Sequence, residues 1–304
     1  MNLSDDKILF KKIIANASEF FSIPRSYIEK DFYAISLLKR VININSNIVF
    51  KGGTCLSKCY NVIERFSEDI DVSVIEDHLT QGQRRSLVHE NIEKSINELG
   101  LTLSNPDSIR SKRVFNRFIC KYNTLVDASE TFANVLFELA MQSPCFPYEE
   151  RICQTFAGRY LDETNNHDLT IKYGLEAFKV KTQKLERTFV DKIYAVCDYQ
   201  ISKKLERNSR HLYDLHKILP KIKLDDDLIE LFTEVRKYRV TNETCYSVQG
   251  DNKLHILFDA LINEETFKND FNNVTSPLLY DDTKYSDIYN SLLIISNFLN
   301  KYAI

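Results

Sequence analysis

Glycine is scarce in this chain, and several familiar sequence signals are missing. Only seven of the 304 residues are glycine, and neither a GxxxxGK[ST] phosphate loop nor a GxGxxG fingerprint occurs. The absence of any apolar run of about eighteen residues predicts no transmembrane helix. The opening residues, MNLSDDKILFKKIIANASEFF, carry acids where a signal peptide has a basic and then an apolar stretch. We therefore expect a cytoplasmic protein with no membrane partner.

The cysteines show no metal-binding pattern either. There are seven, and no CxxC pair occurs. Cys55 and Cys59 would share one face of a helix, but structural zinc would need two more ligands at a recognisable spacing. We interpret the cysteines as reduced thiols that pack as small hydrophobic side chains.

The charge balance excludes a surface that is basic throughout, because the net charge is -3. Local basic stretches occur at residues 84–85, 110–117 and 179–187. Such stretches could hold the phosphates of a nucleotide or of RNA. Each of them alone is more typical of a solvated face.

Hydrophobic periodicity divides the chain into a mixed region and a helical region. In the first part we predict helices at 5–21, 26–41, 54–63 and 79–98, and strands at 47–50 and 69–75. Two segments within 110–141, rich in Val, Phe, Ile and Leu, predict an antiparallel strand pair beside those strands. We expect residues 144–175 to be irregular.

Helical spacing dominates the rest of the chain. The predicted helices there span 185–201, 208–219, 226–238 and 283–301. The fold class that we predict is α+β: a small mixed sheet flanked by helices over residues 1–175, followed by a mostly helical region over residues 176–304.

The two motifs most indicative of a functional site lie in residues 51–74, KGGTCLSKCYNVIERFSEDIDVSV. Gly52 and Gly53 follow a predicted strand, and a glycine pair allows a sharp turn and a close ligand approach. The backbone amides there, at the start of a helix near Thr54, could cradle a phosphate. As an isolated motif, the pair is more typical of a plain turn.

Asp69 and Asp71 lie two residues apart on a predicted strand, so both carboxylates share one face. Two adjacent acids repel each other unless a cation lies between them, and Mg²⁺ prefers such oxygen ligands. Acid pairs at strand ends are also common without a metal. The glycine pair followed by the acidic pair predicts a phosphate cradle beside a metal site.

In this combination the chain resembles the nucleotidyltransferase superfamily, and more narrowly the AbiEii/AbiGii toxin family, which includes the MenT-type tRNA-modifying toxins. The positions that match the family's GGT-x-L-x-K and R-x-S-x-D-[IL]-D segments are Gly52, Gly53, Thr54, Leu56, Lys58, Arg65, Ser67, Asp69, Ile70 and Asp71. Further matching segments are EKDF at 29–32, ERTFVDK at 186–192 and SRHLYDL at 209–215. Together they cover roughly residues 26–218.

The resemblance implies an NTP-dependent nucleotidyltransferase that releases pyrophosphate. Asp69 and Asp71 would bind Mg²⁺, with Mn²⁺ as the alternative metal. Lys192 would contact the triphosphate and offset charge on the leaving pyrophosphate, and Asp214 would pin Lys192 or reach the nucleotide. The helical region would thus contribute both side chains to the site. The nucleotide-binding residues expected are Gly52, Gly53, Thr54, Ser57, Lys58, Ser67 and Arg210.

Glu138 is our candidate for a third carboxylate on a neighbouring strand. It lies in the apolar segment VLFELA and would act as a general base or as a metal ligand. The alternative is a structural ion pair with Arg or Lys. For Lys192 the alternative is a surface lysine, and for Asp214 it is a capping or salt-bridged aspartate.

The resemblance also implies the biological role. We expect transfer of a nucleoside monophosphate to an acceptor hydroxyl, in particular the 3′ end of tRNA, by the toxin of a toxin–antitoxin or phage-defence system with a cognate antitoxin. One alternative is transfer to a protein or a small molecule. The other is a protein that binds nucleotide or RNA and has lost catalysis.

Overall fold

The computed structural model describes residues 2–67, 69–75, 81–111, 115–127, 132–140 and 145–304, with backbone only at 81–88 and 110–111. These residues form two compact units. Unit 1 comprises residues 1–60 and 67–182, and unit 2 comprises residues 61–66 and 183–304. Two of the basic stretches are affected: the side chains of residues 84–85, and those of residues 110–114 within the stretch 110–117, are not among the described ones.

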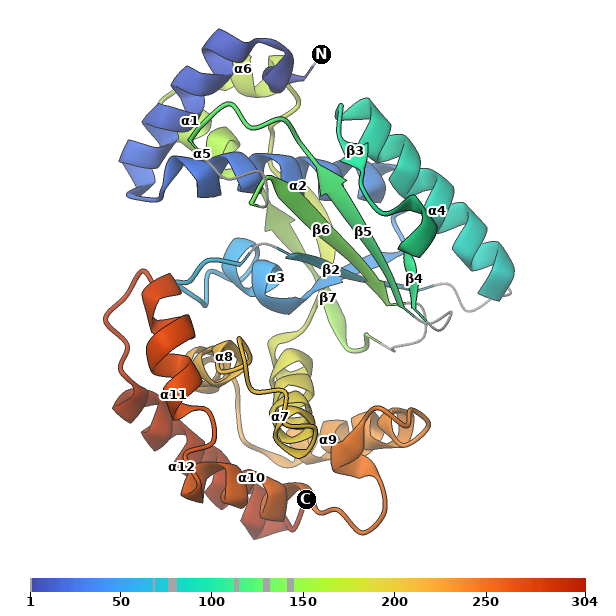
Figure 1. The fold of residues 1–304 in the computed structure, drawn as a ribbon, viewed down its shortest axis with the longest axis vertical. Helices are drawn as coiled ribbons and strands as arrows, with labels where there is room; N and C mark the ends of the chain where they lie inside the picture. Colours follow the sequence, from blue (N-terminus) through green and yellow to red (C-terminus); the bar gives the residue numbers. More distant parts are fainter. Residues whose placement is uncertain (1, 68, 76–80, 112–114, 128–131, 141–144) are drawn as a thin grey trace. The chain divides into compact units, whose positions relative to one another are not determined.

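Unit 1 is built on the predicted mixed sheet. Its strands run in the order β3-β5-β6-β2-β1-β8-β7, and β4 pairs with β5 (Figure 1). The central strands β1 and β2 are antiparallel, whereas β2 and β6, and β1 and β8, are parallel. The bounds are β1 Ile48–Lys51, β2 Asp69–Val74, β3 Thr102–Leu103, β4 Arg110–Ser111, β5 Phe115–Lys121, β6 Asn134–Ala140, β7 Tyr148–Cys153 and β8 Phe178–Gln183. The predicted antiparallel pair is β5 and β6, and β6 lies beside β2.

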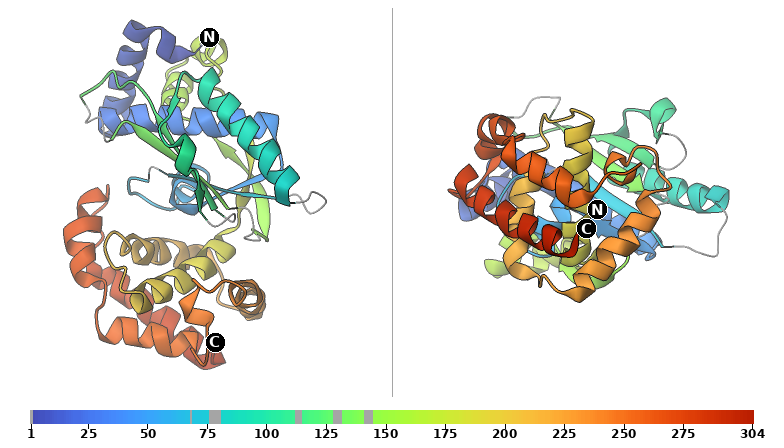
Figure 2. Two further views of the ribbon diagram at one scale, coloured as in Figure 1. Left: turned by 45° about the vertical axis from the view of Figure 1, so that its right-hand side comes forward. Right: turned by 90° about the horizontal axis from the view of Figure 1, so that it is seen from below.

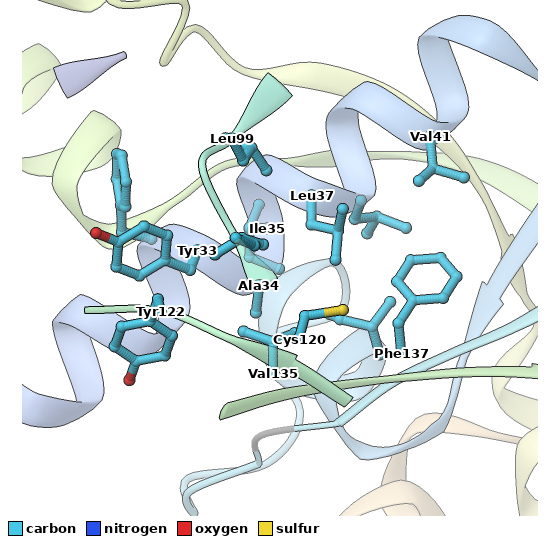
Figure 3. Close-up of a cluster of buried hydrophobic side chains, with 14 of the residues drawn as sticks. Tyr33, Ala34, Ile35, Leu37, Val41, Leu99, Cys120, Tyr122, Val135 and Phe137 are labelled. Atoms are coloured by element: carbon cyan, nitrogen blue, oxygen red, sulfur yellow. The ribbon is translucent and has the colours of Figure 1, made fainter. Parts of the chain in front are cut away.

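Helix α2 forms the core of unit 1 together with one face of this sheet. Its apolar positions recur at helical spacing, so that Leu37 and Val41 lie on the same side and both are fully buried. Figure 3 shows these side chains facing Phe137 of β6 and Cys120 of β5. The helical segments of this unit, α2 included, are α1 Lys7–Phe21, α2 Arg25–Ile44, α3 Gly52–Lys58, α4 Gln81–Glu98, α5 Phe156–Glu163, α6 His167–Lys172 and the 3₁₀ turns Leu3–Asp5 and Pro106–Ser108.

The prediction of irregular structure at 144–175 was wrong for the described residues. Strand β7 and helices α5 and α6 lie there. β7 is the last strand of the sheet order and leaves Glu150, Arg151 and Ile152 exposed, so it lacks the alternating apolar pattern of a half-buried strand. α5 is too short for a clear periodicity, although the Thr155 hydroxyl caps it by accepting from the Gly158 amide at 2.9 Å.

The chain crosses between the two compact units at residues 60–61, 66–67 and 182–183. The predicted boundary after residue 175 precedes β8, which pairs with β1 and so belongs largely to unit 1. The predicted helix at 54–63 ends at Lys58. Residues 61–66 join unit 2, because Phe66 N donates to Leu278 O at 3.1 Å and Tyr280 N donates to Glu64 O at 2.7 Å.

Unit 2 is helical, as predicted. Its helices are α7 Leu185–Ile201, α8 Arg210–Ile218, α9 Asp226–Arg239, α10 Leu254–Asn263, α11 Lys268–Asp270 and α12 Tyr285–Tyr302, with a π-helical turn at Phe271–Thr275 and 3₁₀ turns at Leu219–Lys221, Tyr246–Val248 and Ser276–Leu278. α12 packs beside α8 and α10 (Figure 2). The periodicity analysis did not predict α10 and α11. No helix in the described part of the chain is long and apolar enough to cross a membrane.

We predict that Ile35→Ala in α2 destabilises unit 1 by about 2–5 kcal/mol, because it deletes fully buried methyl groups and leaves a cavity. Urea unfolding followed by circular dichroism measures the change in the free energy of unfolding. The matched control is Ile8→Ala in α1, whose side chain is 85% exposed. A loss of equal size in both variants would show that burial against the sheet is not the cause.

Candidate active site

Asp69 and Asp71 lie on the sheet face opposite the α2 core. The intervening Ile70 and the following Val72 are fully buried on the core side, whereas both aspartates are half-buried. In the parallel pairing of β2 and β6, Asp71 is the direct partner of Glu138. Direct partners point to the same face, so this face carries three carboxylates on two adjacent strands.

Gly52 lies so close to Asp71 that a side chain there would displace the Asp71 carboxylate. Its φ angle is +76°, in the left-handed region. A Cβ on Gly52 would lie 2.1 Å from Asp71 Oδ2. This close approach is possible because β1 and β2 pair with Lys51 opposite Asp71, so the chain turns into α3 immediately beside the carboxylate.

The Thr54 side chain ties α3 to the first residue of β2. Its hydroxyl lies 2.7 Å from the Asp69 carbonyl oxygen and 3.0 Å from Ser67 Oγ. A hydroxyl has one proton, so Thr54 donates to the carbonyl and accepts from the Ser67 hydroxyl. Thr54, oriented by Ser67, therefore fixes the backbone from which the Asp69 side chain projects. Ser57 is half-buried on the same short helix.

Glu138 has a cationic neighbour. Arg117 on β5 is its direct cross-strand partner, and Arg117 Nε donates to Glu138 Oε1 at 2.7 Å. The ion pair was the structural alternative at this position, and the register beside Asp71 is what a third catalytic carboxylate requires. The two are compatible, because one carboxylate has more acceptor sites than Arg117 occupies. The catalytic role of Glu138 stays a prediction.

The donor set on this face fits a hard divalent cation. Carboxylate oxygens on one strand face are the ligands that Mg²⁺ and Mn²⁺ take. Within the described residues, no three carboxylate, imidazole or thiol groups already converge as a complete metal site. A cation held by Asp69 and Asp71 would therefore complete its coordination with water and substrate phosphate, as Mg²⁺ usually does.

In unit 2, Asp214 receives two cations. Arg65 donates to both carboxylate oxygens, through Nε at 2.7 Å and Nη2 at 2.8 Å. Lys192 Nζ lies 2.7 Å from Asp214 Oδ2 and 3.3 Å from His211 Nδ1. All four side chains come from two adjacent helices and the 61–66 segment. Asp214 thus forms an ion pair with Lys192, which fits both the predicted pinning role and the salt-bridged alternative, so its role at the nucleotide stays a prediction. Arg210 begins the same helix.

Two cations on one buried carboxylate set the protonation states of this cluster. Burial alone would raise the pKa of Asp214, but Arg65 and then Lys192 outweigh it and hold the pKa well below its usual range. Burial and the nearby Arg65 lower the pKa of Lys192 against the pull of Asp214. Burial and Lys192 keep the pKa of His211 well below its usual value, so this imidazole is neutral and can accept from the ammonium.

Residues 36–291 match the family described as "Nucleotidyl transferase AbiEii toxin, Type IV TA system". The chain belongs to the AbiEii nucleotidyltransferase toxin family. It is therefore an enzyme of the nucleotidyltransferase class and a toxin of a toxin–antitoxin system. No curated protein matches the chain significantly.

Two solved structures resemble this AbiEii toxin. One is the nucleotidyltransferase toxin MenT4, Rv2826c, from Mycobacterium tuberculosis H37Rv, with 16% identity, a TM-score of 0.55 and coverage of 91% of this chain and 84% of that chain. The other is JHP933 from Helicobacter pylori, with 14% identity, a TM-score of 0.47 and coverage of 90% and 94%. The likeness to MenT4 supports the fold.

Lys58, predicted at the nucleotide, lies in an ion pair within unit 1 of the toxin. Its ammonium is 2.8 Å from Asp31 Oδ1 and 3.4 Å from the centre of the Phe156 ring, and its side chain is 4% exposed. These contacts are structural, since they join α3 to α2 and α5. A contact between Lys58 and the nucleotide stays a prediction.

The Glu-Lys-Asp segment of α2 has a clear structural function that the sequence motif alone did not reveal. Glu29 accepts from the Leu125 amide at 2.8 Å and the Thr124 hydroxyl at 2.6 Å. Asp31 accepts from the Phe156 amide at 2.7 Å, beside its pair with Lys58. Sequence reasoning also matched Arg65 to the family pattern without a role, and the structure shows that it holds Asp214.

We predict that Gly52→Ala nearly abolishes nucleotidyl transfer, because the new methyl group displaces the Asp71 carboxylate. It also carries the strain of a left-handed alanine, about 1 kcal/mol. Gly100→Ala is the matched control, since its φ is +68° but no atom lies within 4 Å of its added Cβ. Transfer assays and urea unfolding compare the two variants. Equal activity in both would refute the close approach as a catalytic constraint.

We predict that Asp214→Asn destabilises unit 2 by about 3–5 kcal/mol, because it removes the charge that two buried cations face. The lowered pKa of Asp214 makes this contribution fully present above about pH 4 and progressively lost at lower pH. Urea midpoints across a pH series measure the gap to wild type, which should narrow in acid. Exposed Asp251→Asn is the control, and a gap that widened in acid would contradict the assigned charge state.

Proposed function

We propose that this toxin transfers a nucleoside monophosphate from an NTP to the 3′ end of tRNA in a reaction that depends on Mg²⁺. The observation that carries the proposal is the left-handed Gly52 turn pressed against Asp71, in a chain of the nucleotidyltransferase toxin family. A turn that exposes backbone amides beside two carboxylates suits a triphosphate and its cation together.

The nucleotide contacts follow from the start of α3. The first amides of a helix have no intrahelical partner, so the amides from Gly52 to Thr54 are available to phosphate oxygens. Asp69 and Asp71 hold the metal, and Mn²⁺ can replace Mg²⁺ because both take oxygen ligands. When bound, such an ion offsets phosphate charge and orients the triphosphate.

Lys192 offsets the charge that develops on the leaving pyrophosphate, as the family resemblance implies. Its cluster contains two cations and one carboxylate, which leaves an excess of one positive charge. Asp214 and His211 hold the ammonium in place. Arg210, at the start of α8, adds a further cation. We propose that these unit 2 side chains act in the same reaction as Asp69 and Asp71.

The transfer itself is a displacement at the α-phosphorus. The acceptor hydroxyl forms the new O–P bond while the bond to pyrophosphate breaks, and the hydroxyl proton passes to a base. Glu138 is our candidate base, oriented by Arg117 on the strand next to Asp71. The protein mainly positions the groups and neutralises charge.

An RNA acceptor is favoured by basic residues on the carboxylate face. Lys181 of β8 is the direct partner of Val49, which is two residues from Lys51, the partner of Asp71. Register therefore places Lys181, and with it Lys179, on the same sheet face as Asp71. An RNA acceptor and an NTP donor place the reaction in the cytoplasm. The family's toxin–antitoxin context implies a cognate antitoxin.

We predict that purified protein with Mg²⁺ and α-³²P-labelled NTPs, each tested in turn, labels tRNA with at least one of them. Asp69→Ala should abolish the label, because it removes a metal ligand. Asp107→Ala, an exposed aspartate of the same unit, should retain it. Label on a polypeptide, or consumption of NTP without labelled RNA, would replace tRNA by a protein or a small-molecule acceptor.

A further inference from the structure

A strip of aromatic and basic side chains crosses β1, β8 and β7 in unit 1. We call it the edge strip and define it as Lys51, Phe146, Tyr148, Lys179 and Lys181. Strand order places β7 at the end of the sheet, two strands from β1. The strip therefore begins on the strand beside Asp71 and runs to the sheet edge, a span of about 10 Å for two strand spacings.

The strand residues of the strip share the face of the catalytic carboxylates. Lys51, the partner of Asp71, and Lys181, the partner of Val49, are placed there by register. Contacts extend the same face to β7. The Lys181 ammonium lies 5.9 Å from the centre of the Tyr148 ring. Lys179 Nζ lies 2.8 Å from Glu150 Oε1, two residues along β7 from Tyr148.

The far end of the strip presents aromatic surface. The Phe146 and Tyr148 rings lie 5.0 Å apart, and Phe146 is 46% exposed. A large apolar side chain so exposed beside a second ring contributes little to the core. Exposed rings beside cations are the combination that binds single-stranded nucleic acid, since bases stack on the rings and phosphates meet the cations.

The opposite face of the edge strand β7 differs in charge. Arg151 donates to Glu149 through both Nε, at 3.1 Å, and Nη2, at 2.9 Å, so its charge is offset locally. On the strip, only Lys179 of the three lysines has a carboxylate partner among the described residues. The two lysines without such a partner, Lys51 and Lys181, thus lie on the carboxylate face.

We propose that the edge strip binds the single-stranded 3′ end of the RNA acceptor, with Lys51 and Lys181 on its phosphates and Tyr148 and Phe146 stacked on its bases. The proposal rests on the proposed function, because it assumes that the acceptor is RNA. It adds the track by which the terminal hydroxyl is guided to Asp69 and Asp71. A polypeptide acceptor would gain little from rings beside lysines, whereas an RNA end uses both.

The test uses the full-length chain and a fluorescein-labelled single-stranded RNA oligonucleotide that ends in CCA. Fluorescence anisotropy at several salt concentrations gives its affinity for wild type, Lys181→Ala, Tyr148→Ala and Tyr148→Phe. The matched control is Lys172→Ala, which removes a lysine from above the ring of Tyr173 on α6, at 5.0 Å, away from the sheet. NTP binding by calorimetry checks that each variant keeps its nucleotide site.

We expect Tyr148→Ala to weaken RNA binding roughly tenfold and Tyr148→Phe to retain it, since both rings stack. Lys181→Ala should weaken binding and reduce the salt dependence by about one counterion. In transfer assays the same two alanine variants should raise the acceptor KM more than they lower kcat. Lys172→Ala should behave as wild type, and NTP affinity should not change in any variant.

Two outcomes would overturn the proposal in different ways. If wild type binds and labels RNA, but Lys181→Ala and Tyr148→Ala match Lys172→Ala, the strip is not the track and the tRNA function stands. If wild type neither binds nor labels RNA while it still consumes NTP in an Asp69-dependent reaction, the acceptor is not RNA. The strip and the tRNA proposal would then fall together.

Discussion

The close approach of Gly52 to Asp71 is the constraint on which the rest of unit 1 depends. A side chain at position 52 would occupy the place of the Asp71 carboxylate. The position of this candidate metal ligand therefore depends on the turn between β1 and α3. The antiparallel pairing of β1 with β2 sets this distance, and the Thr54 hydroxyl fixes the neighbouring backbone at Asp69. The turn at Gly52 and the two carboxylates are thus positioned by the same few hydrogen bonds, which explains why so short a stretch of sequence can specify this geometry.

Several charged residues of the family pattern hold other candidate site residues in place. Asp31 joins Lys58 of α3 to the first amide of α5, so it anchors the helix that begins at Gly52. Arg65 holds Asp214 in a bidentate pair, and Asp214 in turn holds Lys192. A planar guanidinium can make this two-pronged contact, whereas a lysine at position 65 could not. A sequence pattern therefore mixes groups that meet substrate with groups that orient them, and only contacts separate the two kinds.

The sequence predicted the features that are encoded locally. Asp69 and Asp71 share a face because strand residues alternate, and the helices of unit 2 follow apolar spacing closely at α7, α8, α9 and α12. It failed where structure depends on distant partners. β7 is exposed and polar and exists as a strand because of its place at the sheet edge, and residues 61–66 leave unit 1 because Leu278 and Tyr280 pair with them. The pairing of Glu138 with both Asp71 and Arg117 likewise depends on register, which no local pattern contains.

The charged cluster around Asp214 in unit 2 is better explained by anion binding than by its contribution to stability. Burying three charged groups is costly, and an apolar replacement of such a cluster is often as stable or more so. Burial, together with the nearby Arg65, lowers the pKa of Lys192, so the protonated ammonium is less favourable there than in water. An approaching polyphosphate would reverse that balance, because its negative charge stabilises the ammonium that the protein alone destabilises. The cluster would thus be better matched to a bound anion than to the empty protein, and this is the charge arrangement that the proposed role of Lys192 at the leaving pyrophosphate requires.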